Sequence, residues 1–585
     1  AIVMRTMCGV CVAGCVGLLA AACASGDLES PGGRSAPSRP VGDGEVGVGG
    51  PFSPTTGTAT AGRGAAPGVG AAGTIASLPP EVEATVDLQL PQASENYVYA
   101  VNPAAGTVAV IDAATQSIST LKTGNRPTYL RTIDKTDDAV VLNIGSNKAS
   151  VIRVRDHVPT KSDLPVSAGS NAIAMAADGK HAIVYYNSTY ASAGQGAGSY
   201  QDVSVLSLSG DGQSDRAISM TVGFRPRDVA FAADGTQAFV ITEDGVSVLD
   251  FADLEKKGSG IARLVTFGGN VDQKNLDVSV TPDGRYALAR ADEQSSLHLV
   301  ELSTGQVRSL ELGAVYTALT GTSPATEEDA GVPPALLVNV TDLDLMPGGK
   351  RALAVLRNQG AVLEIPLPEA FADPTQIKLT LVPEQVIGSV TISPDGLYAV
   401  AYTTVAEFER VVVMDLDKHT PPRAVALRKS VRAVAFTPDG KTALITHNNA
   451  PGSPAEIGLT PDQVIDRSFG YSLLRVASAD VKLQVTRTKL GPIAMVPDGS
   501  YLFILFRDDS LGVKEVQRVA LSSFLVDPII QLENAPISLG TALGSGTVFV
   551  NLEHPDGRMT FIDWQQPLEK LKTVTGFELN SRIRD

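Results

Sequence analysis

Cysteine, tryptophan and basic side chains are all scarce in this sequence. All four cysteines lie within the first 23 of 585 residues, tryptophan occurs once, at Trp564, and acidic residues outnumber basic ones by 63 to 47. The chain beyond Cys23 therefore cannot form a disulfide, a zinc–thiolate site or a Cys-x-x-Cys-His haem attachment. A single tryptophan and an aromatic content of 5% argue against a stacked quinone cofactor. The formal net charge of −16 argues against nucleic acid and against docking on an anionic membrane through a basic patch.

The cysteine-bearing start of the chain has the layout of a secretory signal. Residues 4–23 contain one arginine, an apolar run and small residues before Cys23. Leu-Ala-Ala-Ala-Cys at 19–23 resembles the bacterial lipobox, in which cleavage exposes a cysteine that carries lipid, although Leu19 stands one place earlier than usual. Cys15, after Val-Ala-Gly, is an alternative with a shorter apolar run. A single transmembrane anchor is another alternative, although glycine and cysteine interrupt the roughly 20 apolar residues that it needs. We expect 1–23 to be a lipoprotein signal peptide with lipidation at Cys23.

The next segment is dominated by small residues and proline. Residues 24–80 consist mostly of glycine, proline, alanine, serine and threonine. Such a composition lacks the large apolar side chains that offset the entropy cost of ordering a chain. We therefore expect a disordered tether that joins the lipid to a domain over 81–585. We further expect the protein to lie in the bacterial cell envelope, held to a membrane only through its N-terminus and facing the periplasm or the exterior.

Most of the remaining sequence repeats one phrase, in which a hydrophobic strand, a turn ending in Asp-Gly or Gly-Gly and a second hydrophobic strand follow one another. The turn glycines lie about 44 to 65 residues apart. They are Gly179, Gly235, Gly284, Gly349, Gly396, Gly440 and Gly499. A repeat of this length with four short strands is typical of β-propeller blades. Proline, aspartate and glycine each suit a tight hairpin turn, so we assign these turns no chemistry.

The first repeat resembles a known propeller type. Tyr-Val-Tyr-Ala-Val-Asn at 97–102, Thr-Val-Ala-Val-Ile-Asp at 107–112, and Gly124 followed by Pro127 are similar to the YVTN-type, lactonase-like β-propeller repeat. The resemblance covers one unit well and the others loosely, and it implies a fold and not an activity. We predict an all-β propeller of four-stranded antiparallel blades. About ten quasi-repeats can be counted, with seven or eight complete blades as the alternative, and a strand near 85–90 is a candidate for closing the ring.

Three long insertions share one face of the predicted ring. If the strands of a blade are named A to D from the axis outward, the B-to-C and D-to-A loops leave on the same face. The insertions at Asn187–Asp202 and His447–Gly470 join B to C, and that at Gly313–Asn339 joins D to A. Thr460 followed by Pro461 predicts a helix start in one of them. Because function concentrates in loops on a rigid scaffold, we expect this face to be the binding surface.

A column of charged residues stands where strand A enters each repeat. Asp228, Asp277 and Asp342 share one register, Arg227 and Arg432 match one place earlier, and Arg126 and Arg225 share a Gly-x-Arg-Pro phrase. The aspartates could cap their own turns and pair with the arginines. Alternatively, the arginines could bind an anionic ligand, or the carboxylates could hold Ca²⁺ near the central channel. We expect no other cofactor and no zinc site, since the six histidines show no ligand spacing.

The candidate general bases are two loop histidines. His447, followed by Asn448, ends a strand B beside the longest B-to-C insertion, and His554 ends the equivalent strand of the last repeat. The catalytic residues of the lactonase-like family cannot be transferred, because only scaffold motifs match. We therefore predict a non-enzymatic binding module for an envelope protein or polysaccharide. The alternative is a lactonase-like hydrolase of a small sugar lactone.

Overall fold

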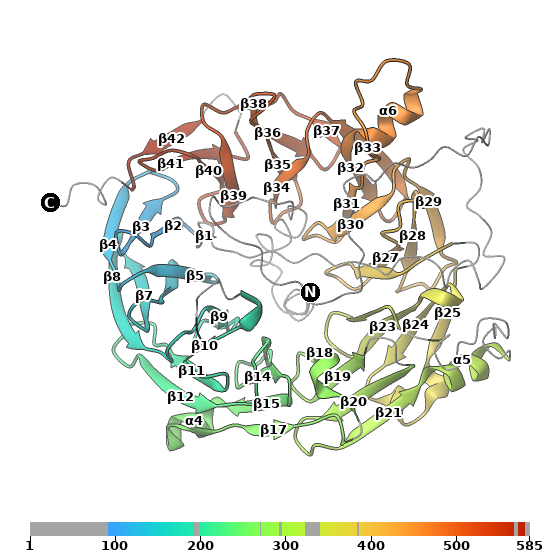
Figure 1. Ribbon diagram of the computed structural model, residues 1–585, viewed down its shortest axis with the longest axis horizontal. Helices are drawn as coiled ribbons and strands as arrows, with labels where there is room; N and C mark the ends of the chain where they lie inside the picture. The colour runs from blue at the N-terminus through green and yellow to red at the C-terminus, as the bar shows by residue number, and fades with distance from the viewer. Residues whose placement is uncertain are drawn as a thin grey trace.

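The fold is a ring of ten radial sheets. The computed structural model describes residues 92–190, 196, 198–269, 271–291, 295–321, 338, 340–382, 385–566 and 571–578. Within these ranges the chain forms a ten-bladed β-propeller in which each blade is an antiparallel sheet that follows the chain order from the axis outward (Figure 1). The all-β prediction and the count of ten repeats are confirmed, and the alternative of seven or eight blades is wrong. The signal peptide, the tether and the closing strand expected near 85–90 lie outside these residues.

The ten blades have the following strands. Blades 1 to 3 contain β1 (Gln92–Ala93), β2 (Tyr97–Asn102), β3 (Thr107–Asp112), β4 (Ile118–Lys122), β5 (Pro127–Ile133), β6 (Asp138–Asn143), β7 (Lys148–Arg155), β8 (Val158–Pro165), β9 (Ala172–Met175), β10 (His181–Tyr185), β11 (Asp202–Ser207) and β12 (Arg216–Thr221). Blades 4 to 6 contain β13 (Asp228–Phe231), β14 (Gln237–Thr242), β15 (Gly245–Asp250), β17 (Arg263–Val265), β18 (Leu276–Val280), β19 (Tyr286–Ala291), β20 (Ser296–Glu301), β21 (Val307–Glu311), β22 (Asp342–Leu345), β23 (Arg351–Leu356), β24 (Ala361–Pro366) and β25 (Lys378–Leu381). Blades 7 to 10 contain β26 (Ser389–Ile392), β27 (Tyr398–Tyr402), β28 (Arg410–Asp415), β29 (Arg423–Ala426), β30 (Val431–Phe436), β31 (Thr442–His447), β32 (Phe469–Arg475), β33 (Asp480–Thr486), β34 (Leu490–Met495), β35 (Tyr501–Asp508), β36 (Val513–Ala520), β37 (Leu525–Val526), β38 (Ile530–Gln531), β39 (Pro536–Ala542), β40 (Thr547–Leu552), β41 (Arg558–Asp563) and β42 (Lys572–Thr575).

Strand composition follows position in the blade. The middle strands are rich in valine, isoleucine and alanine and are covered on both faces, so that every residue of β3 and β6 is buried. The outermost strands are polar, as in β8, where only Leu164 is buried. Charged and polar side chains on such a strand discourage pairing with another molecule. The Asp-Gly turns join strands A and B as predicted: in the turn before β14, Gly235 has φ 71° and Asp234 Oδ1 accepts the Thr236 N–H at 3.0 Å.

The hydrophobic core lies between neighbouring blades. Each cluster of buried residues joins two sheets, and the cluster at the ring closure packs Ala542, Phe549 and Phe561 of blade 10 against Val98 and Ile111 of blade 1. Figure 1 shows these two blades, red and blue, side by side. Blade 10 contains four consecutive strands of its own, β39 to β42. The closure that the described residues show is therefore made by side-chain packing and by loop hydrogen bonds such as Gly544 N–H to Glu95 O at 2.7 Å.

Two neighbouring blades also share a sheet. The C-to-D connection of blade 4 contains helix α4 (Phe251–Lys257) and strand β16 (Gly260–Ile261), and β16 pairs in parallel with β12 of blade 3. Phe251 and Leu254 of α4 are buried, and the Phe251 ring stacks on His181 of blade 3 at 3.8 Å. Blade 4 therefore covers the outer edge of blade 3. Nowhere in the described part of the chain is a helix long and apolar enough to span a membrane.

Candidate functional site on the loop face

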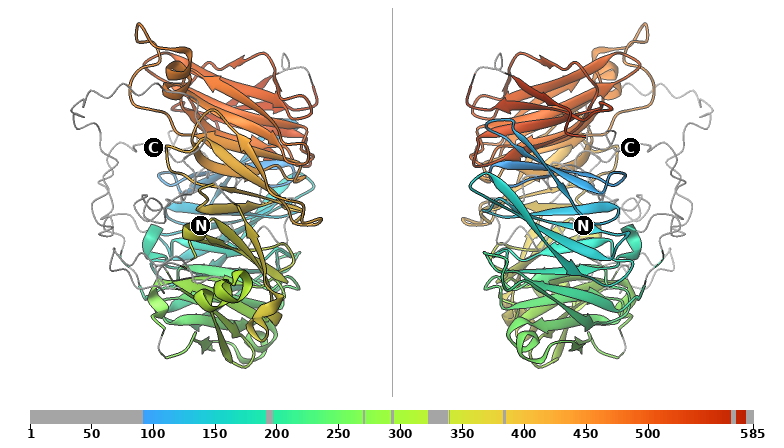
Figure 2. Two further views of the ribbon diagram at one scale, coloured as in Figure 1. Left: turned by 90° about the vertical axis from the view of Figure 1, so that its right-hand side faces the viewer. Right: turned by 90° about the vertical axis from the view of Figure 1, so that its left-hand side faces the viewer.

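The three insertions emerge on the face of the ring that the sequence predicts. Figure 2 shows the blades from the side, with their strands running across the thickness of the ring. The loop face is defined here as the side that carries the B-to-C and D-to-A connections. On it lie the short helix η1 (Ser188–Tyr190) after β10, helix α5 (Leu312–Thr320) after β21, and helix α6 (Pro461–Arg467) after β31. The predicted start of α6 is confirmed, since Thr460 and Gln463 form a capping box.

Helix α6 is attached to the ring by a buried lysine. Lys429 is 2% exposed and donates to the carbonyl oxygens of Ile465 at 2.8 Å and Asp466 at 2.9 Å. These carbonyls belong to the last turn of α6, where a cation is favoured by the helix dipole. Burial lowers the pKa of this ammonium. The insertion of blade 8 is thus anchored to the D-to-A loop that precedes its own blade.

The two Gly-x-Arg-Pro phrases form the same kind of D-to-A turn. Arg126 and Arg225 have φ of 53° and 51°, and the residue before each arginine accepts a backbone hydrogen bond from the B-to-C turn of the following strand pair. For Arg225 this bond runs from Glu243 N to Phe224 O at 2.8 Å. A Cβ on Gly223 would collide with Thr242 Oγ1, so glycine allows the close approach. The phrase therefore has a structural role, and only its arginine side chains remain for binding.

Arg225 belongs to an aromatic cluster that the sequence did not predict. The aromatic–arginine cluster consists of Tyr186, Tyr200, Phe224, Arg225 and Glu243. Tyr200 packs edge-on against Tyr186 at 5.6 Å and lies 5.8 Å from Phe224. The Arg225 guanidinium lies 5.6 Å from the Tyr200 ring centre and 5.2 Å from that of Phe224, and it pairs with Glu243 at 3.5 Å. Tyr200 and Phe224 remain 41% and 37% exposed, so both rings present surface on the loop face.

The aspartates of the column differ in their partners. Asp342 connects two blades, because Oδ1 accepts the Leu343 N–H at 2.9 Å and Oδ2 accepts the Val390 N–H of the next blade at 2.8 Å. Asp277 instead pairs with Arg290 of its own blade at 3.2 Å. The sequence thus places the three aspartates in one register, but the structure gives them separate partners.

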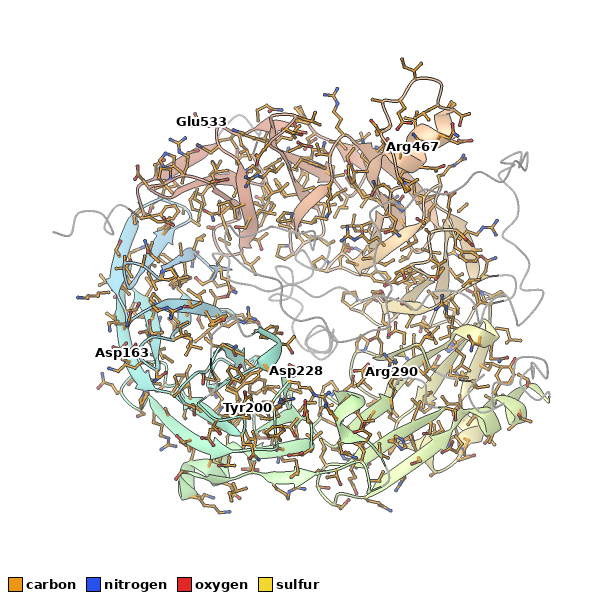
Figure 3. All side chains as sticks on the ribbon, viewed as in Figure 1. Asp163, Tyr200, Asp228, Arg290, Arg467 and Glu533 are labelled. Carbon is orange, nitrogen blue, oxygen red and sulfur yellow. The ribbon has the colours of Figure 1, made fainter. Side chains whose placement is uncertain are left out.

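Asp228 is the exception within the column. It is 4% exposed, Oδ1 accepts the Val229 N–H at 2.7 Å, and Oδ2 is buried without a hydrogen-bond partner among the described residues. Burial raises the pKa of this carboxyl to about 7. Asp228 and Arg290 lie on the inner side of the ring (Figure 3). Asp228 is therefore buried between blades at the rim of the channel and offers no exposed carboxylate.

The arginines one place earlier also contact the scaffold. Arg227 donates to three backbone carbonyls, those of Lys274 at 2.9 Å and of Thr242 and Leu276 at 3.3 Å. Arg227 thereby connects the entries of blades 4 and 5. Arg432 lies at the register shift between β30 and β31, and Arg432 itself is half-buried. Of the predicted arginines, Arg225 is the one that the structure places beside exposed aromatic rings.

His447 and Asn448 are likewise tied to the backbone. His447 Nδ1 lies 3.0 Å from Ser430 O and Nε2 lies 2.7 Å from Ser472 Oγ, and Ser472 is fully buried. Burial lowers the pKa of His447 to about 4, so its ring is neutral near pH 7. Asn448 Nδ2 donates to Val431 O at 3.0 Å. The histidine and serine resemble a catalytic pair in geometry, but a serine without exposed surface cannot reach a substrate.

The described part of the chain contains no group of three or more His, Cys, Asp or Glu side chains placed to hold a metal ion. Oxygen ligands for Ca²⁺ must converge on one point. In Asp342 both oxygens already accept backbone hydrogen bonds.

Comparison with known proteins supplies no family. No family model matches the chain, and no curated protein matches it. Among solved structures, the chain is similar to Kuenenia stuttgartiensis hydrazine synthase, with 15% identity over 60% of this chain and 95% of that chain and a TM-score of 0.29. It is also similar to the dihydro-haem d1 dehydrogenase NirN, with 16% identity over 65% and 74% and a TM-score of 0.35. At these values the similarity carries no inference about function.

Proposed function

We propose that this protein is a binding module of the bacterial cell envelope that recognises an envelope protein or polysaccharide through its loop face. The observation that carries the proposal is the aromatic–arginine cluster. Tyrosine and arginine are enriched among the residues that dominate binding energy, and contiguous exposed apolar surface is a feature of interaction sites. The chain has few aromatic residues, so two partly exposed rings around one guanidinium are a notable concentration.

The proposal is supported by what the other predicted site residues do. Arg227, Asp342 and Asn448 hold loops and blades together through backbone hydrogen bonds. The cluster, in contrast, leaves aromatic surface exposed above a rigid turn. A preformed surface of this kind loses little conformational entropy on binding, because tyrosine and phenylalanine have few rotatable bonds.

Binding to envelope material tests the proposal. The full chain carrying Cys23→Ala, which removes the expected lipid site, is sedimented with envelope fragments of the source organism. We expect the double variant Tyr200→Ala/Phe224→Ala to reduce the bound fraction by about tenfold, as loss of an interface hot spot does. Leu397, which is 43% exposed in an A-to-B turn on the opposite face, supplies the matched control Leu397→Ala. Equal binding of the parent chain and the double variant would contradict the proposal.

Lipid anchoring is a separate part of the proposal and has its own test. It is supported by the similarity of residues 19–23 to the lipobox. Cells that express the full chain are grown with labelled palmitate. We expect Cys23→Ala to abolish labelling and Cys15→Ala to preserve it, and the reverse result would assign the lipid to Cys15.

A further inference from the structure

A strap of blade 4 lies across the outer edge of blade 3. The strap is defined here as helix α4 and strand β16, residues 251–261, and Figure 1 shows α4 at the outer rim of the ring. Little backbone pairing holds it, since β16 makes only two residue pairs with β12, Gly260 with Met220 and Ile261 with Thr221. A helix of seven residues is also marginal in isolation. The strap therefore depends on side-chain packing against blade 3.

Two apolar side chains of α4 provide that packing. Phe251 and Leu254 are buried in one cluster with Ile218 and Met220 of blade 3. The Phe251 ring also stacks on the His181 imidazole, with the ring centres 3.8 Å apart and the ring planes at 7° to each other. His181 of blade 3 therefore supports the first residue of α4, where the strap leaves blade 4.

The His181 ring has no hydrogen-bond partner among the residues that the structure describes. Nδ1 and Nε2 are both buried, and Glu255 Oε1 of α4 lies 3.9 Å from Nε2, which is too far for a hydrogen bond. Glu255 instead accepts a hydrogen bond from Ser207 Oγ at 3.1 Å and pairs with Arg216 at 3.3 Å. A proton added to His181 in the closed strap would therefore create a buried charge without a direct acceptor.

Burial is the largest influence on the charge of His181, and it lowers the pKa of the ring. Asp178, in the turn before β10, and Glu255 oppose this effect without reversing it, whereas Lys180 adds to it. When the strap is open the ring is solvated, so that it recovers an ordinary pKa near 6.5. Acid therefore favours the open strap over the closed strap.

We propose that α4 and β16 form an acid-sensitive strap, which opens when His181 is protonated and uncovers the outer edge of blade 3. Opening breaks the stack on Phe251 and frees the two residue pairs between β16 and β12. It also exposes apolar side chains such as Met220, whose Cε lies 3.8 Å from where a Cβ on Gly260 would stand. An uncovered strand edge beside apolar surface can pair with a strand of a partner. The strap does not involve the aromatic–arginine cluster, so either proposal can fail without the other.

Hydrogen exchange of the full chain carrying Cys23→Ala, at pH 7.5 and at pH 5.5, tests the strap. Each rate is divided by the intrinsic exchange rate at its pH to give a protection factor. We expect residues 251–261 to lose protection by about fivefold to tenfold at pH 5.5, which is one unit below the pKa of a solvated histidine. Strands β3 and β6 should keep their protection, which distinguishes opening of the strap from global unfolding. Asp228 of blade 4 stabilises the fold in acid and so cannot cause the loss.

Variants of His181 separate its protonation from other effects of acid. His181→Phe keeps an aromatic ring against Phe251 but cannot titrate, and His181→Leu is a second variant without a titratable group. We expect both variants to show equal strap protection at the two pH values. His298 of β20 in blade 5 also has a pKa lowered by burial, and the matched control His298→Gln should retain the acid response of the strap.

Three results would overturn the proposal. Unchanged protection of the strap in the parent chain would show that its closure does not depend on pH. Protection that rises in acid would mean that Glu255 captures the protonated ring and tightens the strap. An acid response that persists in both His181 variants would assign the opening to another group.

Discussion

At the scale of single residues, two buried titratable groups affect stability in opposite directions. Asp228 has a pKa raised by burial to about 7, and His447 has a pKa lowered by burial to about 4. Between pH 4 and pH 7 the folded chain holds a proton on Asp228 that the unfolded chain releases. Over a similar range the unfolded chain binds a proton on His447 that the folded chain does not. Asp228 therefore makes the fold less stable as pH rises, whereas His447 makes the fold more stable as pH rises.

Replacing Asp228 should reveal the first effect. The folded pKa of about 7 exceeds the unfolded value near 3.8, so the carboxyl destabilises the fold progressively from pH 4 to pH 7. The full penalty is on the order of 4 kcal/mol at pH 8. We expect Asp228→Asn to be more stable than the parent at pH 8 and nearly equal to it at pH 4, measured by chemical denaturation at each pH. The control Asp342→Asn removes an acceptor for the Leu343 or Val390 N–H and should destabilise the chain at both pH values.

Replacing His447 should reveal the second effect. The neutral His447 imidazole makes its full contribution to stability above the unfolded pKa near 6.5, and this contribution is lost as pH falls toward the folded pKa of about 4. We expect His447→Gln to reduce the loss of stability between pH 6.5 and pH 4, by up to about 3 kcal/mol. His157, whose side chain is 81% exposed, supplies the matched control for a histidine-to-glutamine change at the surface. An unchanged acid dependence in His447→Gln would contradict the buried neutral state.

At the scale of elements, the turns decide how closely the blades approach. Gly223 lets the D-to-A turn before blade 4 lie close against Thr242 at the end of β14. The Gly223 N–H also donates to Ser247 Oγ of β15 at 2.9 Å. The same turn presents Phe224 and Arg225 to solvent. Scaffold and candidate binding surface are thus made by consecutive residues.

A methyl group at Gly223 should therefore be costly. The added Cβ would collide with Thr242 Oγ1, and relief requires moving the turn or the threonine. We expect Gly223→Ala to lower the free energy of unfolding by about 1 to 3 kcal/mol, as overpacking does. Gly210, around which an added Cβ would meet nothing within 4 Å, supplies the control, and Gly210→Ala should change stability by less than about 0.5 kcal/mol.

Whether the sequence predicts a contact depends on how far apart the contacting residues lie along the chain. The Asp-Gly turns set the strand register because they need a particular backbone conformation, and that requirement is local. The partners of the aspartate column are not local. Asp342 reaches Val390 of the next blade, whereas Asp277 pairs with Arg290 across its own sheet. The aromatic–arginine cluster is not local either. Tyr200 lies in an insertion and meets Phe224 only after folding, although Phe224 stands directly before Arg225 in the sequence.

At the scale of the whole molecule, the ring has one junction between the two ends of the domain. There Phe549 packs with Val98, Ile111 and other side chains of blades 10 and 1. All other neighbouring blades are also linked by the chain itself. The closure therefore depends on packing more than any other junction does.

Truncation of Phe549 should open this junction first. Phe549→Ala should cost about 3 to 5 kcal/mol, and so should Phe503→Ala at the third position of the equivalent strand in blade 9. Hydrogen exchange should distinguish the two variants. We expect Phe549→Ala to speed exchange chiefly in blades 1 and 10, because no covalent connection holds them together, and Phe503→Ala to leave blade 1 protected. Equal protection of blade 1 in both variants would show that the closure is no weaker than the other junctions.

The shortness of β1 has a mechanical consequence. This innermost strand of blade 1 contains only Gln92 and Ala93, paired with Tyr99 and Val98. Tension applied to the chain before Gln92 enters the ring through these two residue pairs. They can separate under a small load, whereas β2 and β3 are joined along six residues each. A pull from the N-terminal side would then lengthen the connection by a few residues before it strained the rest of the propeller.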